Sequence, residues 1–324
     1  MTVPAPTEPG AAPAAPSRPA RRQPVLLDPA TFPAEFDPDC YRALNSDLRH
    51  LSDEELVAHW ERVGRDQGRR AHPLPDRVAF ADLARGGAPL LEIGPSLRPV
   101  FRGHHVRYFE TMPPEDLVRR DRAHGEPAAR PPRIDFVSAD GDLSVVRGRY
   151  AVVASSHVLE HTPDLVGHLQ HVEHLLLPGG HYALFLPDRR YCLDALMPET
   201  TFADVLEAAL ERRTRHSLRT VVREHLLRTH NDPTRHWRGD HGAPEHLDAD
   251  GVADAVRAYD EATEAGRYLD RHAWHLTPAS FRQTVDLLHA VGLTALRPLR
   301  VYPTLAGSNE FWAILERPAD AVRA

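Results

Sequence analysis

The stretch from Leu90 to Ser96 reads L-L-E-I-G-P-S, and a second apolar run, V-R-Y-F-E, follows from Val106 to Glu110. A short apolar run that ends in an acid and a glycine is typical of a buried parallel strand whose carboxyl end opens into a ligand crevice. Gly94 has no Cβ, so a ligand can approach the backbone there. Glu110 ends the second run, where open α/β sheets bind ribose hydroxyls. The two runs together predict a nucleoside site.

The residues after Gly94 indicate which nucleoside ligand to expect. A dinucleotide site needs the pattern G-x-G-x-x-G leading into a helix whose N-terminus binds pyrophosphate. Here a single glycine is followed by P-S-L-R-P, and Pro99 interrupts any long helix at that point. A ligand with a ribose and no pyrophosphate therefore fits better than NAD. Taken alone, these residues also fit a core strand that ends in an ordinary turn.

Length and composition restrict the class of protein. The chain has 324 residues, 42% of them hydrophobic, which is enough for one large α/β domain with an appendage. Its formal net charge of -7 argues against a nucleic-acid partner, because such proteins normally have a basic face. All 39 basic residues are arginines, so lysine Schiff-base chemistry and a Walker-type phosphate loop are both excluded.

Targeting signals and cysteines point to the cytoplasm. No apolar run approaches the length of a membrane span, and the N-terminus lacks the order of regions that marks a signal peptide. Cys40 and Cys192 lie far apart and form no metal or redox spacing, which weakly indicates a reducing compartment. We therefore expect a cytoplasmic protein without a membrane span.

Helix signals cluster at both ends of the chain. Asp37 with Pro38 predicts a helix start, and Ser52 with Glu55 has the spacing of a capping box for a second helix that ends near Gly64. Further helices are predicted over 76–84, from 162–164 to Leu176, and from Thr277 through Leu288.

Apolar runs alternate with these helices. They predict strands over 134–137, 150–155 and 182–186, and two closing strands over 295–302 and 310–315. Alternating strands and helices predict a parallel sheet with right-handed crossovers.

These patterns divide the chain into six regions. We expect a disordered Pro/Ala-rich arm (1–24), an N-terminal helical module (25–75), a core with five strands (76–187), a mostly helical cap insertion (188–275), the rest of the core (276–318) and a tail (319–324).

In this order the pieces resemble class I S-adenosylmethionine-dependent methyltransferases. L-L-E-I-G-P-S is similar to their first motif, Y-F-E to their ribose-binding strand, S-A-D-G-D-L to their adenine loop, and A-S-S-H-V-L-E-H-T-P-D to their fourth-strand motif. L-L-P-G-G-H-Y-A-L-F-L-P-D-R-R-Y resembles a bacterial subgroup often associated with glycosyltransferase systems. The resemblance implies an α/β fold: a Rossmann-like seven-stranded sheet with helices on both faces, closed by an antiparallel hairpin. It departs from the family in keeping one glycine and in ending the second strand with glutamate and Thr111.

The resemblance also implies a binding site for S-adenosyl-L-methionine. Carried over position by position, the cofactor-binding residues are Glu92, Gly94, Pro95, Ser96, Glu110, Asp140, Gly141, Asp142, Ser155, Ser156 and His157. Glu110 takes the ribose hydroxyls, the loop 140–142 meets the adenine, and 155–157 flank the sulfonium. For Asp140 and its neighbours a plain surface turn is an equally good interpretation.

Four residues are candidates for the catalytic machinery. His157 is the first choice for a general base, because an imidazole titrates near neutral pH. Asp188 is a second candidate base. Arg189 and Tyr191 leave the same strand end, where an arginine could hold an acidic group of the substrate by a two-pronged hydrogen bond. The alternatives are a histidine that packs against the cofactor and an ion-paired loop that leads into the cap.

The cap is rich in histidine and aspartate. His225, His230, His236, His241 and His246 lie close to several aspartates, and such a composition can bind zinc. No defined ligand spacing is present, so we predict no metal ligands. A helical insertion at this edge is expected to cover the crevice.

The expected function is transfer of a methyl group to a polar small molecule or a saccharide, with oxygen as the acceptor atom. A nicotinamide-dependent oxidoreductase and a non-catalytic partner of a glycosyltransferase are the alternatives. The N-terminal module resembles a short module found beside bacterial glycosyltransferase domains, which implies docking to glycan-assembly enzymes. A helical pair that packs on the main domain explains the same residues.

Overall fold

A computed structural model of the chain describes residues 24–86, 88–123, 125 and 131–319. Of the arm predicted over 1–24, residues 1–23 lie outside the described residues, as do residues 320–324 of the tail. Within the described residues, no helix is both long and apolar enough to cross a membrane.

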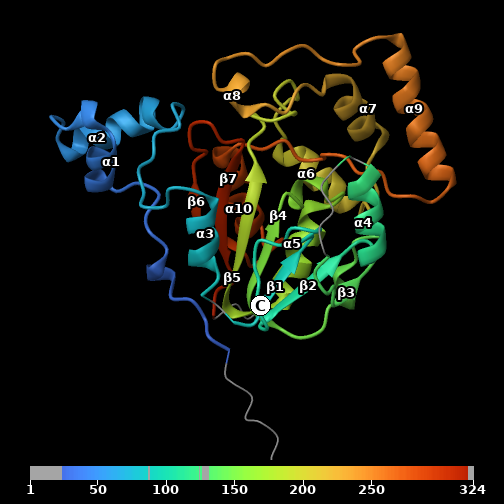
Figure 1. Cartoon of the computed structure of the whole chain (residues 1–324), viewed down its shortest axis with the longest axis horizontal. Helices are drawn as coiled ribbons and strands as arrows, with labels where there is room; N and C mark the ends of the chain where they lie inside the picture. Colours follow the sequence, from blue (N-terminus) through green and yellow to red (C-terminus); the bar gives the residue numbers. More distant parts are fainter. Residues whose placement is uncertain (1–23, 87, 124, 126–130, 320–324) are drawn as a thin grey trace, which may run out of the picture.

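A seven-stranded sheet forms the centre of the molecule (Figure 1). Its strands lie in the order β3-β2-β1-β4-β5-β7-β6, and β7 is antiparallel to both of its neighbours. The strands are β1 (Leu90–Ile93), β2 (Val106–Glu110), β3 (Phe136–Val137), β4 (Tyr150–Ser156), β5 (Leu176–Pro187), β6 (Arg297–Tyr302) and β7 (Glu310–Glu316). The predicted α/β sheet with a closing antiparallel hairpin is thus confirmed.

The register brings the carboxyl ends of the parallel strands to one edge. Ile93 pairs with Phe109 of β2 on one side and with Ser155 of β4 on the other. Ser155 in turn pairs with Leu184 of β5. Residues that directly follow these strands are therefore neighbours across this edge, although those after β1 and β5 are 94 positions apart in the chain.

Helices cover both faces of the sheet. Because side chains alternate along a strand, Leu91 and Ile93 pack into the core beneath α5 (Leu165–Leu175) and α10 (Pro278–Ala290). Leu90 lies on the opposite face, where α3 (Arg77–Ala84) and Phe32 of the N-terminal segment complete a second core. This two-layered burial fixes the strand ends in place.

The predicted helix starts are confirmed by their capping contacts. Asp37 accepts from the amide of Cys40 at the start of α1 (Pro38–Leu44), and Ser52 and Glu55 form both bonds of a capping box at α2 (Asp53–His59). Thr277 likewise caps α10. Beyond His59 the chain forms a π-helical turn, Trp60–Gly64, instead of continuing α2.

Two strand boundaries differ from the prediction. The third strand is only Phe136–Val137, because the amide of Tyr108 donates to the Asp135 carboxylate instead of to a backbone carbonyl of the neighbouring strand. The fifth strand begins at Leu176, directly after α5, instead of at Tyr182. Pro178 to Gly180 therefore lie within the strand. Gly179 has φ of 76° and lies where the pairing of β5 with β4 shifts in register.

The cap consists of four helices, α6 (Phe202–Leu210), α7 (Leu218–Leu227), α8 (Pro233–His236) and α9 (Ala249–Glu264). Val205 and Ala208 anchor α6 in the core that α5 shares. Figure 1 shows α7, α8 and α9 beyond the carboxyl ends of the strands, where the predicted site lies. The helix α4 (Pro114–Ala123), which we did not predict, follows β2 at the same edge.

Candidate cofactor and acceptor site

A hydrogen bond joins the ends of β1 and β2. The amide of Ser96 donates to Glu110 Oε1 over 2.6 Å, and the amide of Thr111 donates to Glu110 Oε2 over 3.1 Å. Gly94 has φ of 68° and Ser96 has φ of 51°, so the chain turns sharply to bring the Ser96 amide to the carboxylate. Arg120 of α4 donates to the Ser96 hydroxyl over 2.7 Å. The structure therefore brings together three of the predicted cofactor residues.

The Glu110 carboxylate retains capacity for a ligand. Its side chain is buried, and burial raises the pKa of Glu110 against the opposing effect of the two amide bonds. A carboxylate offers about four lone-pair sites, and the two backbone donors use two of them. The remaining sites are the type that binds a pair of ribose hydroxyls.

Glu92 holds a loop instead of facing the predicted ligand. Its two oxygens accept from the amides of Val100 and Phe101 over 2.7 Å and 3.0 Å. Burial raises the pKa of Glu92 to about 7. The structure thus assigns to Glu92 the ordering of the turn that follows Gly94, where we expected a direct cofactor contact.

Val158 covers Gly94. A Cβ built on Gly94 would lie 2.5 Å from Cγ2 of Val158, so the valine side chain occupies the space beside the glycine backbone. Residues 94–105 contain no helix, and a pyrophosphate would find no helix N-terminus after β1. The described loop therefore does not favour a dinucleotide ligand.

The predicted adenine loop follows β3 beside Glu110. The amide of Ser138 donates to the backbone oxygen of Glu110 over 3.1 Å, which sets the loop against the end of β2. Asp140 is exposed and accepts from the hydroxyl of Ser138, while Gly141 has φ of 75°. Asp142 caps a short 3-10 helix by accepting from Ser144 over 2.8 Å. Of the two acids, Asp140 is the more exposed to a ligand.

The end of β4 divides its polar residues between two sides of the sheet. The Ser155 hydroxyl is buried beneath α5, 2.8 Å from the hydroxyl of Tyr182, and does not face the edge. The Ser156 hydroxyl accepts from Arg77 over 2.8 Å. Of the predicted trio, His157 lies closest to the space under the cap.

His157 lies between two carboxylates. Its Nε2 is 3.1 Å from Glu310 Oε2, and its Nδ1 is 3.4 Å from Glu160 Oε1. Burial alone lowers the pKa of His157, but the hydrogen bonds and charges of the two carboxylates outweigh burial and raise it to about 9. At neutral pH the ring is then a cation and a donor, which does not favour its predicted use as a general base.

Glu310 and Arg77 are site residues that we did not predict. Glu310 accepts from Arg77 over 2.9 Å and from the indole of Trp312 over 3.0 Å, in addition to its contact with His157. The signal in the sequence is an acid at the start of an otherwise apolar strand, E-F-W-A-I-L-E. It lies on the last strand, far along the chain from the predicted site.

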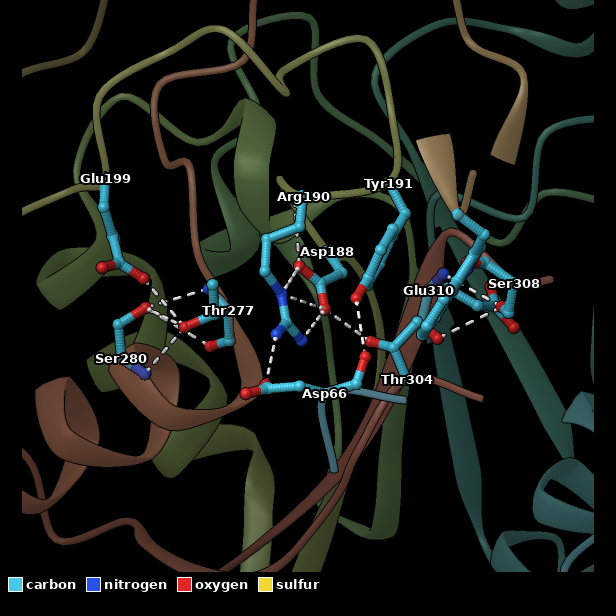
Figure 2. Close-up of polar contacts among 11 residues, drawn as sticks. Asp66, Asp188, Arg190, Tyr191, Glu199, Thr277, Ser280, Thr304, Ser308 and Glu310 are labelled. Atoms are coloured by element: carbon cyan, nitrogen blue, oxygen red, sulfur yellow. Dashed lines mark hydrogen bonds and ion pairs between the residues drawn. The ribbon is translucent and has the colours of Figure 1, made fainter. Parts of the chain in front are cut away.

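The residues after β5 form a structural network, shown in Figure 2. Asp188 is fully buried and accepts from Arg190 and from the hydroxyl of Thr304 over 2.7 Å each. Arg190 also contacts Asp66 of the N-terminal module over 3.2 Å. Because these partners use both carboxylate oxygens, Asp188 is not placed to take a proton from an acceptor.

The other two predicted residues of this segment also serve contacts within the chain. Arg189 donates to the backbone oxygen of Met197 and so holds the turn that enters the cap. The ring of Tyr191 stacks on that of Trp237, with centroids 3.8 Å apart, and its hydroxyl reaches the backbone of Asp66. The structure therefore shows these residues connecting the N-terminal module and the cap to the sheet.

A cavity of about 540 Å³ lies within the cap. Charged and polar side chains line it: Glu224, His225, Arg228, Thr229, His230, Asn231, Glu245, His246 and Arg271, together with Leu193. It collects several of the cap histidines that the sequence shows as a cluster. Its chemistry suits a polar molecule with hydroxyl or carboxylate groups.

The strand order, with an antiparallel strand between β5 and β6, decides the fold. The chain has a Rossmann-like methyltransferase fold. No protein-family model matches it, and no curated protein does.

Several of the solved structures to which the chain is similar are methyltransferases. A glycopeptide N-methyltransferase, MtfA, solved with S-adenosyl-L-methionine, is 23% identical over 31% of this chain and 48% of its own, with a TM-score of 0.23. The chain thus spans about half the length of that protein. CcbJ from Streptomyces caelestis is 13% identical over 79% of this chain and 90% of its own, with a TM-score of 0.37.

A Burkholderia thailandensis 1,6-didemethyltoxoflavin-N1-methyltransferase, solved with that compound and S-adenosylhomocysteine, is 16% identical. The match covers 95% of this chain and 100% of its own, with a TM-score of 0.36. At these identities and TM-scores, the three similarities carry no argument about the activity or the substrate of the present chain.

Proposed function

We propose that the chain is an S-adenosylmethionine-dependent methyltransferase that acts on a polar small molecule. The observation that carries the proposal is the bond from the Ser96 amide to Glu110, which sets a buried carboxylate beside the turn after β1. In open α/β sheets this is the position at which ribose hydroxyls bind.

The residues that would hold the cofactor follow from the geometry at this edge. Glu110 would accept the ribose hydroxyls through its unused lone pairs, and Asp140 would meet the adenine amino group. The backbone at Gly94 would lie along the methionine part. The cofactor supplies an electrophilic methyl group, so the work left to the protein is alignment of an acceptor and removal of a proton.

The acceptor is proposed to enter from the cap cavity, with a saccharide or another hydroxylated molecule as the substrate and oxygen as the methylated atom. The polar lining of that cavity, with Arg228 and Arg271 beside Glu224 and Glu245, supports a ligand rich in hydroxyl or acidic groups. His157 is proposed to orient the site as a cation held by Glu160 and Glu310, instead of acting as the base.

Isothermal titration with S-adenosylhomocysteine tests the first half of the proposal, with micromolar binding as the expected result. No heat at a protein concentration of about 100 μM would reject it. Incubation of cell extract fractions with cofactor that carries an isotopic methyl group, followed by identification of the labelled compound, tests the second half.

A protein that has the fold without turnover is the second candidate. The position of Val158 beside Gly94 favours it, because the valine side chain leaves less room for a ligand along that glycine. Binding of S-adenosylhomocysteine with no labelled product from any extract would support this candidate over the enzyme. Quenching or enhancement of NADH fluorescence by the protein would instead support the oxidoreductase, which the single glycine and the missing helix after β1 disfavour.

Docking to a glycan-assembly enzyme through the N-terminal module is a further part of the proposal. The module contacts the main domain through Asp66 and through the backbone pair of Gly68 and Ala306, which also fits a purely structural role. Exposed Val57 and Val63 of the module offer apolar surface. Loss of co-purification with a glycosyltransferase on substitution of both valines by serine would support docking.

A further inference from the structure

Three ligand-type side chains converge where η5 (Leu159–His161) meets the segment of the cap that follows α9. Glu160, His161 and His272 each offer one nitrogen or carboxylate oxygen, and these atoms all lie within 4.8 Å of one another. Glu160 is 2% exposed, and the contacts of its carboxylate with the neighbouring histidines are long. Its nearest polar neighbours are His157 Nδ1 at 3.4 Å and His161 Nε2 at 3.8 Å.

The two histidines are each oriented by a second carboxylate. His161 Nδ1 lies 2.7 Å from Asp270 Oδ1, and His272 Nδ1 lies 2.7 Å from Asp194 Oδ2. A histidine that binds a metal almost always donates its other ring N–H to a carboxylate or a carbonyl, which fixes the ring and its tautomer. Here His272 has this support as a hydrogen bond, while His161 has the Asp270 carboxylate at ion-pair distance; both contacts are made at Nδ1, which leaves the Nε2 atom of each ring to face a ligand.

Backbone contacts hold the three residues together independently of any ligand. The backbone oxygen of Glu160 accepts from the amide of Ala273 over 2.7 Å, which ties the segment that carries His272 to η5. The indole of Trp274 donates to the backbone oxygen of Thr162 over 2.7 Å. The His161 and His272 rings meet edge to face, with centroids 4.6 Å apart. The cluster is therefore preorganised.

We propose that Glu160, His161 and His272 bind one divalent first-row transition-metal cation, with Asp194 and Asp270 as second-sphere partners. Two imidazoles and one carboxylate suit Zn²⁺, Co²⁺, Fe²⁺ or Ni²⁺ and leave coordination positions open, whereas Mg²⁺ and Ca²⁺ prefer oxygen ligands throughout. Atoms that bind one ion at about 2.1 Å lie at most about 4.2 Å apart, so closure of less than about 1 Å completes the site. The inference does not depend on the proposed methyl transfer.

The proposal competes with a metal-free account of the same residues. In that account the histidines carry protons and share them with Glu160, Asp194 and Asp270 as a buried ion-pair network. The two accounts differ in whether the native chain takes up one equivalent of metal and in which residues that uptake requires.

Titration of the full chain, freed of metal with a chelator, with Co²⁺ and then Zn²⁺ tests the proposal. We expect a visible Co²⁺ absorption band that saturates at one equivalent and disappears when Zn²⁺ displaces the Co²⁺. Glu160→Gln and His272→Gln should each weaken Co²⁺ binding at least about 100-fold, and Asp194→Asn about 10- to 100-fold. His225→Gln is the matched control: this histidine stacks on His246 in the cap cavity, and its loss should leave the titration unchanged.

Several outcomes would overturn the proposal. They are the absence of a saturable band in the native chain, and a band that survives both Glu160→Gln and His272→Gln but is lost in His225→Gln. Circular dichroism shows whether each variant folds. Because Glu160 is buried and its variant could unfold, anomalous scattering from crystals of the native chain soaked in Zn²⁺ provides a test without substitution. A peak between the three ligands supports the site, and a peak elsewhere overturns it.

Discussion

The amide of Ser96 donates a 2.6 Å hydrogen bond to Glu110 Oε1, although Ser96 follows β1 and Glu110 is the last residue of β2. This bond makes the turn after β1 and the carboxylate at the end of β2 one structural unit. The unit is the centre of the proposed nucleoside site. Its charge can be removed by replacing one oxygen of the Glu110 carboxylate with an amide nitrogen.

Glu110→Gln should weaken binding of S-adenosylhomocysteine about 10- to 100-fold. The amide keeps the shape of the carboxylate but loses its charge, and hydrogen bonds to charged groups contribute about 1.5–3 kcal/mol. Isothermal titration measures the change. Glu115→Gln is the control, because Glu115 is exposed on the neighbouring α4, and this change should not affect binding. Equal affinities for Glu110→Gln and the native chain would remove Glu110 from the site.

Gly94→Ala should destabilise the chain by about 1–3 kcal/mol, because it adds a clash to a backbone cost. Gly94 has φ of 68°, and the new Cβ would lie 2.5 Å from Val158. Gly292→Ala is the matched control: Gly292 has φ of 75°, and no atom lies within 4 Å of its Cβ position. Urea denaturation of both variants separates the cost of the positive φ from the cost of the clash with Val158. Equal losses of stability would show that the Val158 side chain moves aside at no measurable cost.

The sequence predicted the elements whose signals are local. Capping residues such as Ser52 and Thr277 mark helix starts through contacts within four positions, and the structure has those contacts. Buried strands such as β4 are apolar on both faces, so their runs are visible without knowledge of the fold. Gly94 and Glu110 share one edge because parallel strands align their carboxyl ends.

Contacts between side chains from distant parts of the chain could not be predicted from the sequence. Asp188 is of a residue type that can act as a catalytic base, but it is hydrogen-bonded to Thr304 and ion-paired with Arg190. Glu310 reaches His157 only because β7 inserts between β5 and β6. His272 lies 111 positions after His161, so no spacing rule for metal ligands could connect them.

Arg190→Met should destabilise the chain by about 3–5 kcal/mol, because it leaves the buried Asp188 carboxylate without its cationic partner. Asp66→Asn is the control, because it removes the other carboxylate that contacts the Arg190 guanidinium. The Asp66 side chain is 78% exposed, and exposed pairs contribute about 0–1 kcal/mol. Thermal unfolding of the two variants compares them directly. A loss below about 1 kcal/mol for Arg190→Met would mean that the Thr304 hydroxyl and the backbone amide of residue 190 satisfy Asp188 without the guanidinium.

Glu92 should make the stability of the chain fall as the pH rises above about 4.5. Burial raises the pKa of Glu92 to about 7 in the folded state from the ordinary value of 4.5 for a glutamate. Between these values the folded state holds a proton that the unfolded state has lost, so unfolding becomes easier with rising pH. The slope is at most about 1.4 kcal/mol per pH unit, and it vanishes above about pH 7.

Glu92→Gln should remove this slope while lowering stability by a constant amount. The amide group can accept only through its oxygen, so one of the bonds from Val100 and Phe101 is lost at every pH, at a cost of about 1–3 kcal/mol. Urea denaturation from pH 4.5 to 8 measures both effects. The loss from the missing hydrogen bond is the same at every pH, whereas the contribution of the Glu92 proton changes with pH. If the variant and the native chain lose stability in parallel over this range, the pKa of Glu92 is not raised in the folded state.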